Sequence, residues 1–325
     1  MPVFKLKDMT QLTNDMYYRT RVMMTLSAIA YTSNASLRNL QEKLDSTEIL
    51  KQEYIAIWLA KTDTDLIYVV KNRLKEDYAI AIKGPVFPFD LSLFFNLYEN
   101  MGIACQVPLP DCRTGGVKIA AGVLKAIQHI DELTFEGETL SHLISHLPDA
   151  ARVYVTGHGI GGSIAAAYSA RLASGNLAGL DVIPYIFGAP AIGNEPFASL
   201  FDQESRNYLF KESSGCVSDK DMIPYAWHDI MGIPMLHYTN ARCPIELILC
   251  AECVTRLLLI AEVLYIQLPQ TLQLKREIEG SEDFLPEAMR QHHHNTYLSL
   301  LGLPPVRSAA SSYFQHHLTM LSGSL

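Results

Sequence analysis

One short segment of this chain limits the possible folds more than any other. Residues 153–156 read Val-Tyr-Val-Thr, a β-branched and aromatic run that favours a buried strand. Residues 157–162 read Gly-His-Gly-Ile-Gly-Gly, and residues 163–170 are mostly alanine and serine. Glycines permit a sharp turn, and small residues let a helix lie close to a sheet. The segment therefore predicts a strand, a tight turn and a helix, the unit of an α/β fold with a mostly parallel sheet.

In lipases and esterases of the α/β-hydrolase fold, such a turn has the pattern Gly-x-Ser-x-Gly, with the nucleophilic serine at its centre. Here the frame Gly157-x-x-x-Gly161 is present, and its centre is Gly159. Glycine has no hydroxyl oxygen that could attack an ester. The segment thus predicts the fold of a hydrolase together with the absence of its nucleophile.

The same turn also matches a dinucleotide-binding pattern, Gly157-x-Gly159-x-x-Gly162. That pattern requires an acidic residue about 20 positions later, at the end of the next strand. Asp181 has this spacing, but it precedes the apolar run 182–187 and would lie at the start of that strand. Its position disfavours nucleotide binding.

Composition is compatible with one large domain and disfavours one class of partner, nucleic acid. The 325 residues are 49% hydrophobic and 18% charged, ordinary values for a globular protein, and one large α/β domain is as plausible as two smaller ones. No Pro/Gly/Ser-rich linker divides the chain, so we expect a single α/β domain over residues 1–325. The net charge of −8 disfavours nucleic acid as a partner. We expect no metal and no cofactor.

Residues 1–8 lack the apolar core of a signal peptide, which indicates a cytoplasmic or non-classically secreted protein. The six cysteines are too few for a disulfide scaffold. Cys250-x-x-Cys253 has no second Cys or His pair at zinc spacing, so we interpret both as buried thiols.

The apolar periodicity predicts alternating strands and helices, with residues 1–50 as an N-terminal helical segment. The expected strands are 54–59, 66–70, 78–82, 152–156 and 182–187, the first two forming a hairpin, and the expected helices lie within 9–44 and at 91–98, 117–133 and 160–172. We expect a helical insertion over 245–290. Its apolar window 245–268 contains Glu246, Glu252, Arg256 and Glu262, so it is a packed helix, a candidate lid or an acyl-chain surface rather than a membrane span.

Three segments in order resemble the class 3 (fungal-type) lipases of the α/β-hydrolase superfamily. The turn Gly-His-Gly-Ile-Gly-Gly corresponds to Gly-His-Ser-Leu-Gly-Gly in that family. Residues 186–194, Ile-Phe-Gly-Ala-Pro-Ala-Ile-Gly-Asn, are similar to its Thr-Phe-Gly-Ser-Pro-Arg-Val-Gly-Asn, and residues 221–224, Asp-Met-Ile-Pro, to its Asp-x-Val-Pro loop. The resemblance covers roughly residues 54–300. It implies an α/β-hydrolase fold with a mostly parallel central sheet and helices on both faces.

The resemblance also implies a triad in the chain order nucleophile, acid, histidine. Gly159 occupies the nucleophile position and Asp221 the acid position. The histidine lies within the tract 292–294, ahead of Tyr297-Leu298. The family spacing favours His292, with His294 as the alternative and His293 least favoured.

Two backbone N–H groups would form the oxyanion hole. One belongs to Ile160, the residue after the nucleophile position. The other follows the glycine of an early turn, which here reads Lys83-Gly84-Pro85. Pro85 has no N–H to donate, so a second catalytic element is also altered.

Two hypotheses follow. In the first, the chain is a lipid-ester hydrolase scaffold that lacks its nucleophile and is inactive; neither Ser163 nor a water held by His292 is a good substitute. In the second, it is a natural pseudolipase that binds a lipid or a protein. Both imply a lipid or acyl-ester ligand, with transient contact to a membrane surface.

Overall fold

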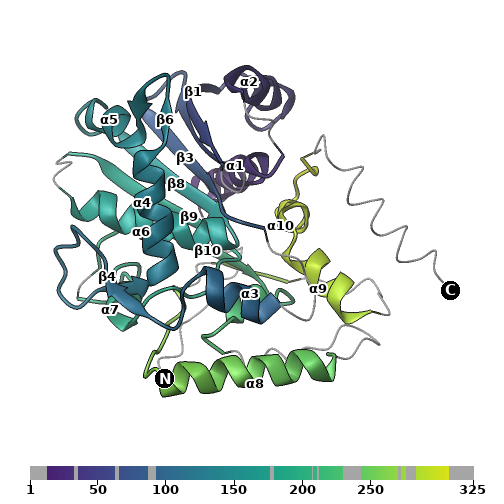
Figure 1. Ribbon diagram of the computed structural model, residues 1–325. Coiled ribbons are helices and arrows are strands. Elements are labelled where there is room, and N and C mark those ends of the chain that lie inside the picture. Colours follow the sequence, from purple (N-terminus) through teal and green to yellow (C-terminus); the bar gives the residue numbers. More distant parts are fainter. Residues whose placement is uncertain are drawn as a thin grey trace.

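The computed structural model shows a central sheet with helices on both faces (Figure 1). It describes residues 13–32, 36–62, 66–86, 93–175, 179–206, 208–210, 212–229, 243–269, 272–275 and 283–306.

Within these residues the central sheet has seven strands and is mixed. The strand order is β1 (Tyr54–Lys61), β2 (Leu66–Asn72), β3 (Asp77–Lys83), β8 (Arg152–His158), β9 (Asp181–Phe187), β10 (Ser214–Ser218) and β11 (Leu272–Leu274). The pairs β1–β2 and β2–β3 are antiparallel, which confirms the predicted hairpin, and every later pair is parallel. The central strands β8 and β9 are buried from their second residue onward, as expected for parallel strands covered on both faces.

Helices form the two outer layers. They are α1 (Asn14–Ala30), α2 (Leu37–Ser46), α3 (Leu93–Asn100), α4 (Ala121–Glu132), α5 (Leu140–Ser145), α6 (Ile160–Ser174), α7 (Glu195–Ser199), α8 (Ile245–Ile260), α9 (Phe284–His292) and α10 (His294–Leu300), with the 3₁₀ helix η2 (Ile223–Tyr225). Two short sheets, β4 (Gln106–Pro108) with β5 (Lys118–Ala120) and β6 (Thr134–Phe135) with β7 (Glu138–Thr139), lie outside the central one.

Side-chain alternation along β8 divides the core into two halves. Val153 and Val155 pack with residues of α4 and α6, whereas Tyr154 packs with residues of α1 and α10. Successive strand residues point to opposite faces, so the two clusters lie on opposite sides of the sheet.

Several predicted boundaries differ from the structure. The N-terminal helical segment consists of α1 and α2, and the part of the prediction before residue 13 lies outside the described residues. The helix expected from Val117 begins at Ala121, because residues 118–120 pair with β4 as strand β5. The segment 245–290 is not helical throughout, since β11 joins the central sheet between α8 and α9.

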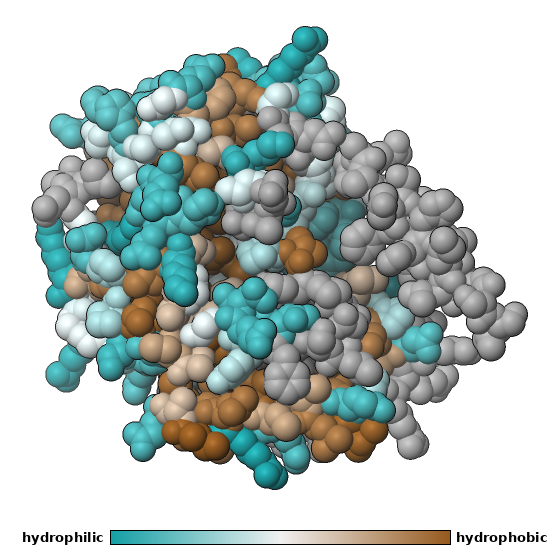
Figure 2. All heavy atoms as spheres, viewed as in Figure 1, coloured by the Kyte–Doolittle hydropathy of each residue, from teal (hydrophilic) through white to brown (hydrophobic). Residues whose placement is uncertain are grey.

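Helix α8 packs one apolar face and exposes another. Leu247, Ala251, Val254 and Leu258 are buried. Apolar side chains nevertheless gather along the lower edge of the view in Figure 2, where α8 lies; those that are exposed include Ile245, Leu249, Leu259 and Ile260. Among the helices that the structure describes, none is long and apolar enough to cross a membrane.

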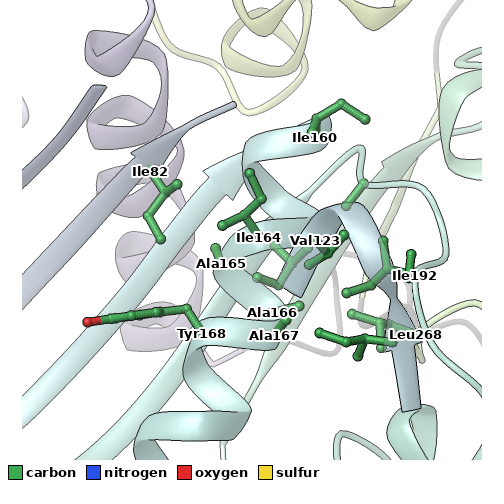
Figure 3. Packing of buried hydrophobic residues seen from close by; sticks show 14 of the residues in the cluster. Ile82, Val123, Ile160, Ile164, Ala165, Ala166, Ala167, Tyr168, Ile192 and Leu268 are labelled. Atoms are coloured by element: carbon green, nitrogen blue, oxygen red, sulfur yellow. The ribbon is translucent and has the colours of Figure 1, made fainter. Parts of the chain in front are cut away.

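Small residues bring α6 close to the sheet. Ala165, Ala166 and Ala167 are fully buried in the core that Figure 3 shows. At the start of the helix, the backbone of Gly157 lies so near Gly161 that a Cβ on Gly157 would be 2.2 Å from the Gly161 carbonyl oxygen. No side chain fits between β8 and the first turn of α6, so glycine at these positions sets the approach of helix to sheet.

We expect Gly157→Ala to lower the free energy of unfolding by about 1–3 kcal/mol, because the atoms that the new Cβ meets are backbone and cannot move aside. Urea unfolding measures this change. Gly115→Ala is the matched control, since Gly115 is exposed and its added Cβ would meet nothing within 4 Å. Equal stability of the two variants would contradict this close packing of α6 on β8.

Candidate functional site

Gly159 forms the turn between β8 and α6. It has φ 56° and ψ −129°, a conformation that L side chains rarely adopt and that glycine tolerates. Its N–H donates to the carbonyl of Phe187 on β9 (2.9 Å), and its carbonyl accepts from the N–H of Ser163 in the first turn of α6 (3.1 Å). The sharp strand-to-helix turn predicted from the sequence is confirmed, and Gly159 lies at its centre.

Asp221 lies three residues beyond the end of β10, which is separated from β8 by β9. The carboxyl ends of these parallel strands meet at one edge of the sheet, which brings Asp221 towards Gly159. Its carboxylate is fully buried, and its Oδ1 accepts the N–H of Ile223 at 3.0 Å. This bond closes the turn that leads into η2.

The other oxygen of Asp221 accepts two side-chain hydrogen bonds. Nδ1 of His292, the last residue of α9, lies 2.8 Å from Oδ2, and the hydroxyl of Tyr297 on α10 donates to the same oxygen at 2.7 Å. Since an ionised carboxylate only accepts, the proton on the neutral imidazole is at Nδ1. The lone pair of Nε2 therefore points away from Asp221.

That lone-pair nitrogen lies against Gly159. A Cβ built on Gly159 would be 2.8 Å from Nε2 of His292 and 3.2 Å from its Cε1. The imidazole thus occupies part of the space that a side chain at position 159 would need. The structure therefore brings together all three residues proposed from the sequence, Gly159, Asp221 and His292.

The two following histidines have other surroundings. Nδ1 of His293 accepts the N–H of Asn295 at 3.1 Å and so caps α10, and the ring of His294 stacks on Tyr31 with ring centroids 5.4 Å apart. Burial, and then the charge that His292 could carry, lower the pKa of His293 to about 4. Burial and the neighbouring imidazoles also hold the pKa of His294 well below its usual value.

His158, just before the turn, is a further buried imidazole. Its ring centroid lies 4.6 Å from that of His292. Burial, and after it the charge that His292 could carry, hold its pKa well below the usual value. The rings behind His292 are therefore neutral at pH 7 and contribute no positive charge to the site.

Sequence reasoning used Tyr297 only as a spacing marker and missed its contacts. Its hydroxyl accepts the N–H of Ser218 at 3.1 Å while it donates to Asp221. Burial, and then the charge of Asp221, raise the pKa of Tyr297 well above its ordinary value, so the hydroxyl keeps its proton. The sequence signal for this contact is a tyrosine five residues after His292. The chain turns between α9 and α10, which brings both side chains to the same carboxylate.

The proposed donor positions lie beside the turn. Ile160 is the first residue of α6, where backbone N–H groups have no partner within the helix. Gly84 packs on the same turn, since a Cβ on it would be 2.6 Å from the Gly161 nitrogen. Pro85 follows directly, so the residue at the second donor position brings no N–H to the site.

Three further sequence interpretations can be compared with the structure. The hydroxyl of Ser163 is buried and donates to the Pro190 carbonyl at 2.9 Å, away from a catalytic role. Asp181 begins β9 opposite Arg152, at the end of the sheet remote from Gly159, which disfavours nucleotide binding. The interpretation of Cys250 and Cys253 as two buried thiols is wrong, because Cys250 is half-buried and Cys253 is exposed on α8.

The chain is similar to known lipases in sequence and in structure. The family described as "Lipase (class 3)" matches residues 94–229. The structure of M37 lipase is 20% identical over 90% of this chain and 95% of its own, with a TM-score of 0.74, and lipase II from Rhizopus niveus is 16% identical over 66% and 76%, with a TM-score of 0.47. Among curated proteins, none matches this sequence. The likeness to M37 lipase shows that the chain has an α/β-hydrolase-type fold, and the family match supports a relation to the class 3 lipases.

The lowered pKa of His293 predicts a pH-dependent stability. Between about pH 6.5 and pH 4 the unfolded chain binds a proton at this residue that the folded chain does not. The free energy of unfolding therefore falls as the pH is lowered through this window, and His293 should contribute about 1–2 kcal/mol of loss between pH 7 and pH 5.

We expect His293→Asn to reduce this loss, because asparagine can still cap α10 but does not titrate. Urea unfolding at pH 7 and pH 5 measures the difference, with His129→Asn on α4, where His129 is exposed, as control. An unchanged pH dependence in His293→Asn would mean that His293 is not buried in the neutral form.

Proposed function

We propose that this chain is a lipase-like, lipid-ester hydrolase scaffold of the Ser-Asp-His type that lacks its nucleophile and is inactive as it stands. The observation that carries the proposal is the hydrogen bond from His292 to Asp221, with Nε2 held against Gly159. An imidazole oriented in this way by a buried carboxylate can take a proton from a hydroxyl on the turn and return it to a leaving group. In this proposal His292 is the base and Asp221 the acid that orients it, and the imidazole lies beside Gly159, where the nucleophile would stand.

Gly159 removes the covalent step. Acyl transfer in such sites begins with a hydroxyl oxygen attacking the ester carbonyl, and glycine has no such oxygen. Loss of the nucleophile in a serine hydrolase reduces kcat by a factor of about 10⁶. The remaining pair could orient water, but without an acyl-enzyme intermediate.

The oxyanion hole is the second element in question. In the proposed assignment Ile160 donates one N–H, and its position at the N-terminus of α6 adds the favourable field of the helix. Pro85 at the other position donates none. Loss of one such donor reduces the rate by a factor of about 10²–10³.

A pseudolipase that binds a lipid or a protein is the second candidate function, and Pro85 is the observation that favours it. A chain whose serine alone had been replaced would be expected to keep both oxyanion donors. A binding protein has no need of them. The two candidate functions share the scaffold. They differ in whether the Gly159→Ser variant hydrolyses an ester.

The ligand class is a lipid or an acyl ester in both cases, a proposal that rests on the resemblance to lipases. Contact with a membrane surface is supported by α8, whose exposed aliphatic side chains include Leu249, Leu259 and Ile260. In this proposal α8 is a candidate lid or acyl-chain surface.

Gly159→Ser should restore measurable hydrolysis of a short-chain p-nitrophenyl ester, while the parent chain stays at the background rate. Gly159→Ala is the matched control, since it adds the same Cβ without a hydroxyl. Activity of the parent equal to that of Gly159→Ser would show that the nucleophile lies elsewhere. Background activity in Gly159→Ser, with the variant folded, favours the binding protein.

Pro85→Ser in the Gly159→Ser background tests the oxyanion assignment. It supplies an N–H at the position after Gly84, and we expect kcat to rise further, by up to about 10²–10³. An unchanged rate would mean that residue 85 does not provide the second donor.

Both Gly159→Ser and Gly159→Ala should be less stable than the parent by about 1–3 kcal/mol, because a side chain at φ 56° is strained. The new Cβ also displaces the His292 ring, whose Nε2 would otherwise be 2.8 Å away. Urea unfolding of the three chains measures the cost. Variants as stable as the parent would contradict the strained turn.

A further inference from the structure

We propose that His142 and His146 form a binding site for a divalent transition metal ion such as Zn²⁺ or Cu²⁺ on the surface of α5. The inference is independent of the proposed hydrolase function. In Figure 1, α5 lies at the upper left, whereas α9 and α10, next to the candidate active site, lie on the right. It departs from the expectation, drawn from the sequence, that the chain holds no metal.

His142 lies in the short helix α5 and His146 is its C-cap. Leu140 and Ile144 are buried in the core. The side chain of Thr139 caps the helix by accepting the N–H of His142 at 3.2 Å. His142 and His146 are four residues apart, so they lie one above the other on the same face. Both are exposed.

The two rings lie side by side. Their centroids are 4.3 Å apart and their planes are tilted by 41°. Histidines four apart on a helix are a known arrangement for binding zinc. A zinc ion binds each imidazole nitrogen at about 2.0–2.1 Å, so two neighbouring rings can share one ion.

Each ring already has its tautomer fixed through Nδ1. Nδ1 of His142 lies 2.8 Å from Oε1 of Glu138, and Nδ1 of His146 lies 2.8 Å from the carbonyl oxygen of His142 and 3.2 Å from Oγ of Ser145. The Ser145 hydroxyl donates its one proton to the same carbonyl at 2.8 Å. The carboxylate and the carbonyl only accept, so both Nδ1 atoms carry the proton in the neutral ring. Each Nε2 therefore presents a lone pair. Metal-binding histidines almost always donate their other N–H to a carboxylate or a backbone carbonyl in this way.

Glu138 is itself held in place. Its carbonyl accepts the indole N–H of Trp58 at 3.1 Å, which ties β7 to the hairpin β1–β2. Its carboxylate orients His142 and makes the ring a stronger ligand. Within the described residues, no group of three or more His, Cys, Asp and Glu side chains could hold a metal, so this site has two protein ligands, with water completing the coordination. Imidazole nitrogen selects zinc, copper or nickel over magnesium and calcium, which prefer oxygen.

The test is calorimetric titration of the full chain with Zn²⁺ alone and with Mg²⁺ alone. We expect the parent chain to bind one Zn²⁺ at this site. In His142→Gln and in His146→Gln this binding event should disappear or become at least about 10-fold weaker. Glu138→Ala should weaken the same event by about 10–100-fold. Mg²⁺ should give no heat from this site.

His129→Gln is the matched control. His129 on α4 is exposed and has a carboxylate, Glu132, 3.9 Å from its Nδ1. The His129→Gln variant should bind Zn²⁺ as the parent does. Cu²⁺ electron paramagnetic resonance adds a second measurement, because the parent should show coupling to two imidazole nitrogens that His142→Gln reduces to one. Zn²⁺ binding that is the same in the parent and in both His142→Gln and His146→Gln would overturn the proposal.

Discussion

The carboxylate of Asp221 is fully buried and accepts hydrogen bonds from three different parts of the chain. An ionised carboxylate can be buried only if its lone pairs are satisfied. The donors are the backbone of Ile223 in the following turn, the imidazole of His292 at the end of α9 and the hydroxyl of Tyr297 on α10. This one group therefore fixes the turn after β10, the direction in which α9 ends and the place of the imidazole over Gly159.

The strand-to-helix turn has a different origin. Its backbone is set by close approaches of Gly157, Gly161 and Gly84, which involve no side chain at position 159. The close approach of helix to sheet therefore depends on these glycines and not on a side chain at the centre of the turn. This separation means that the close packing of the turn needs no side chain at position 159. It also explains why the fold is recognisable from a sequence that has glycine at the centre of the turn.

Local sequence was sufficient for the features that depend on neighbours in the chain. The strand β8, the turn and α6 follow from residues 152–174 alone. The family spacing to Tyr297-Leu298 favoured His292 and left His294 open, and His292 is the one that contacts Asp221. Features that depend on distant partners were missed. Residues 118–120 looked helical but pair with β4, residues 272–274 complete an edge of the sheet, and the hydroxyl of Tyr297 finds Asp221 only in the folded chain. Exposure of Cys253 depends on which face of α8 meets the core, which an apolar run on both faces does not reveal.

The packing of α1 against α10 has a consequence for how the chain folds. The hydroxyl of Tyr17 donates to the carbonyl of Leu301 at 3.2 Å, across a sequence separation of 284 residues, and Arg21 donates to Gly302. Contacts between distant residues form slowly because a long loop must close first. During synthesis the part of α1 that α10 covers therefore stays exposed until α10 has been made. A chain cut short before α10 would lack these contacts and would leave part of α1 exposed to aggregation.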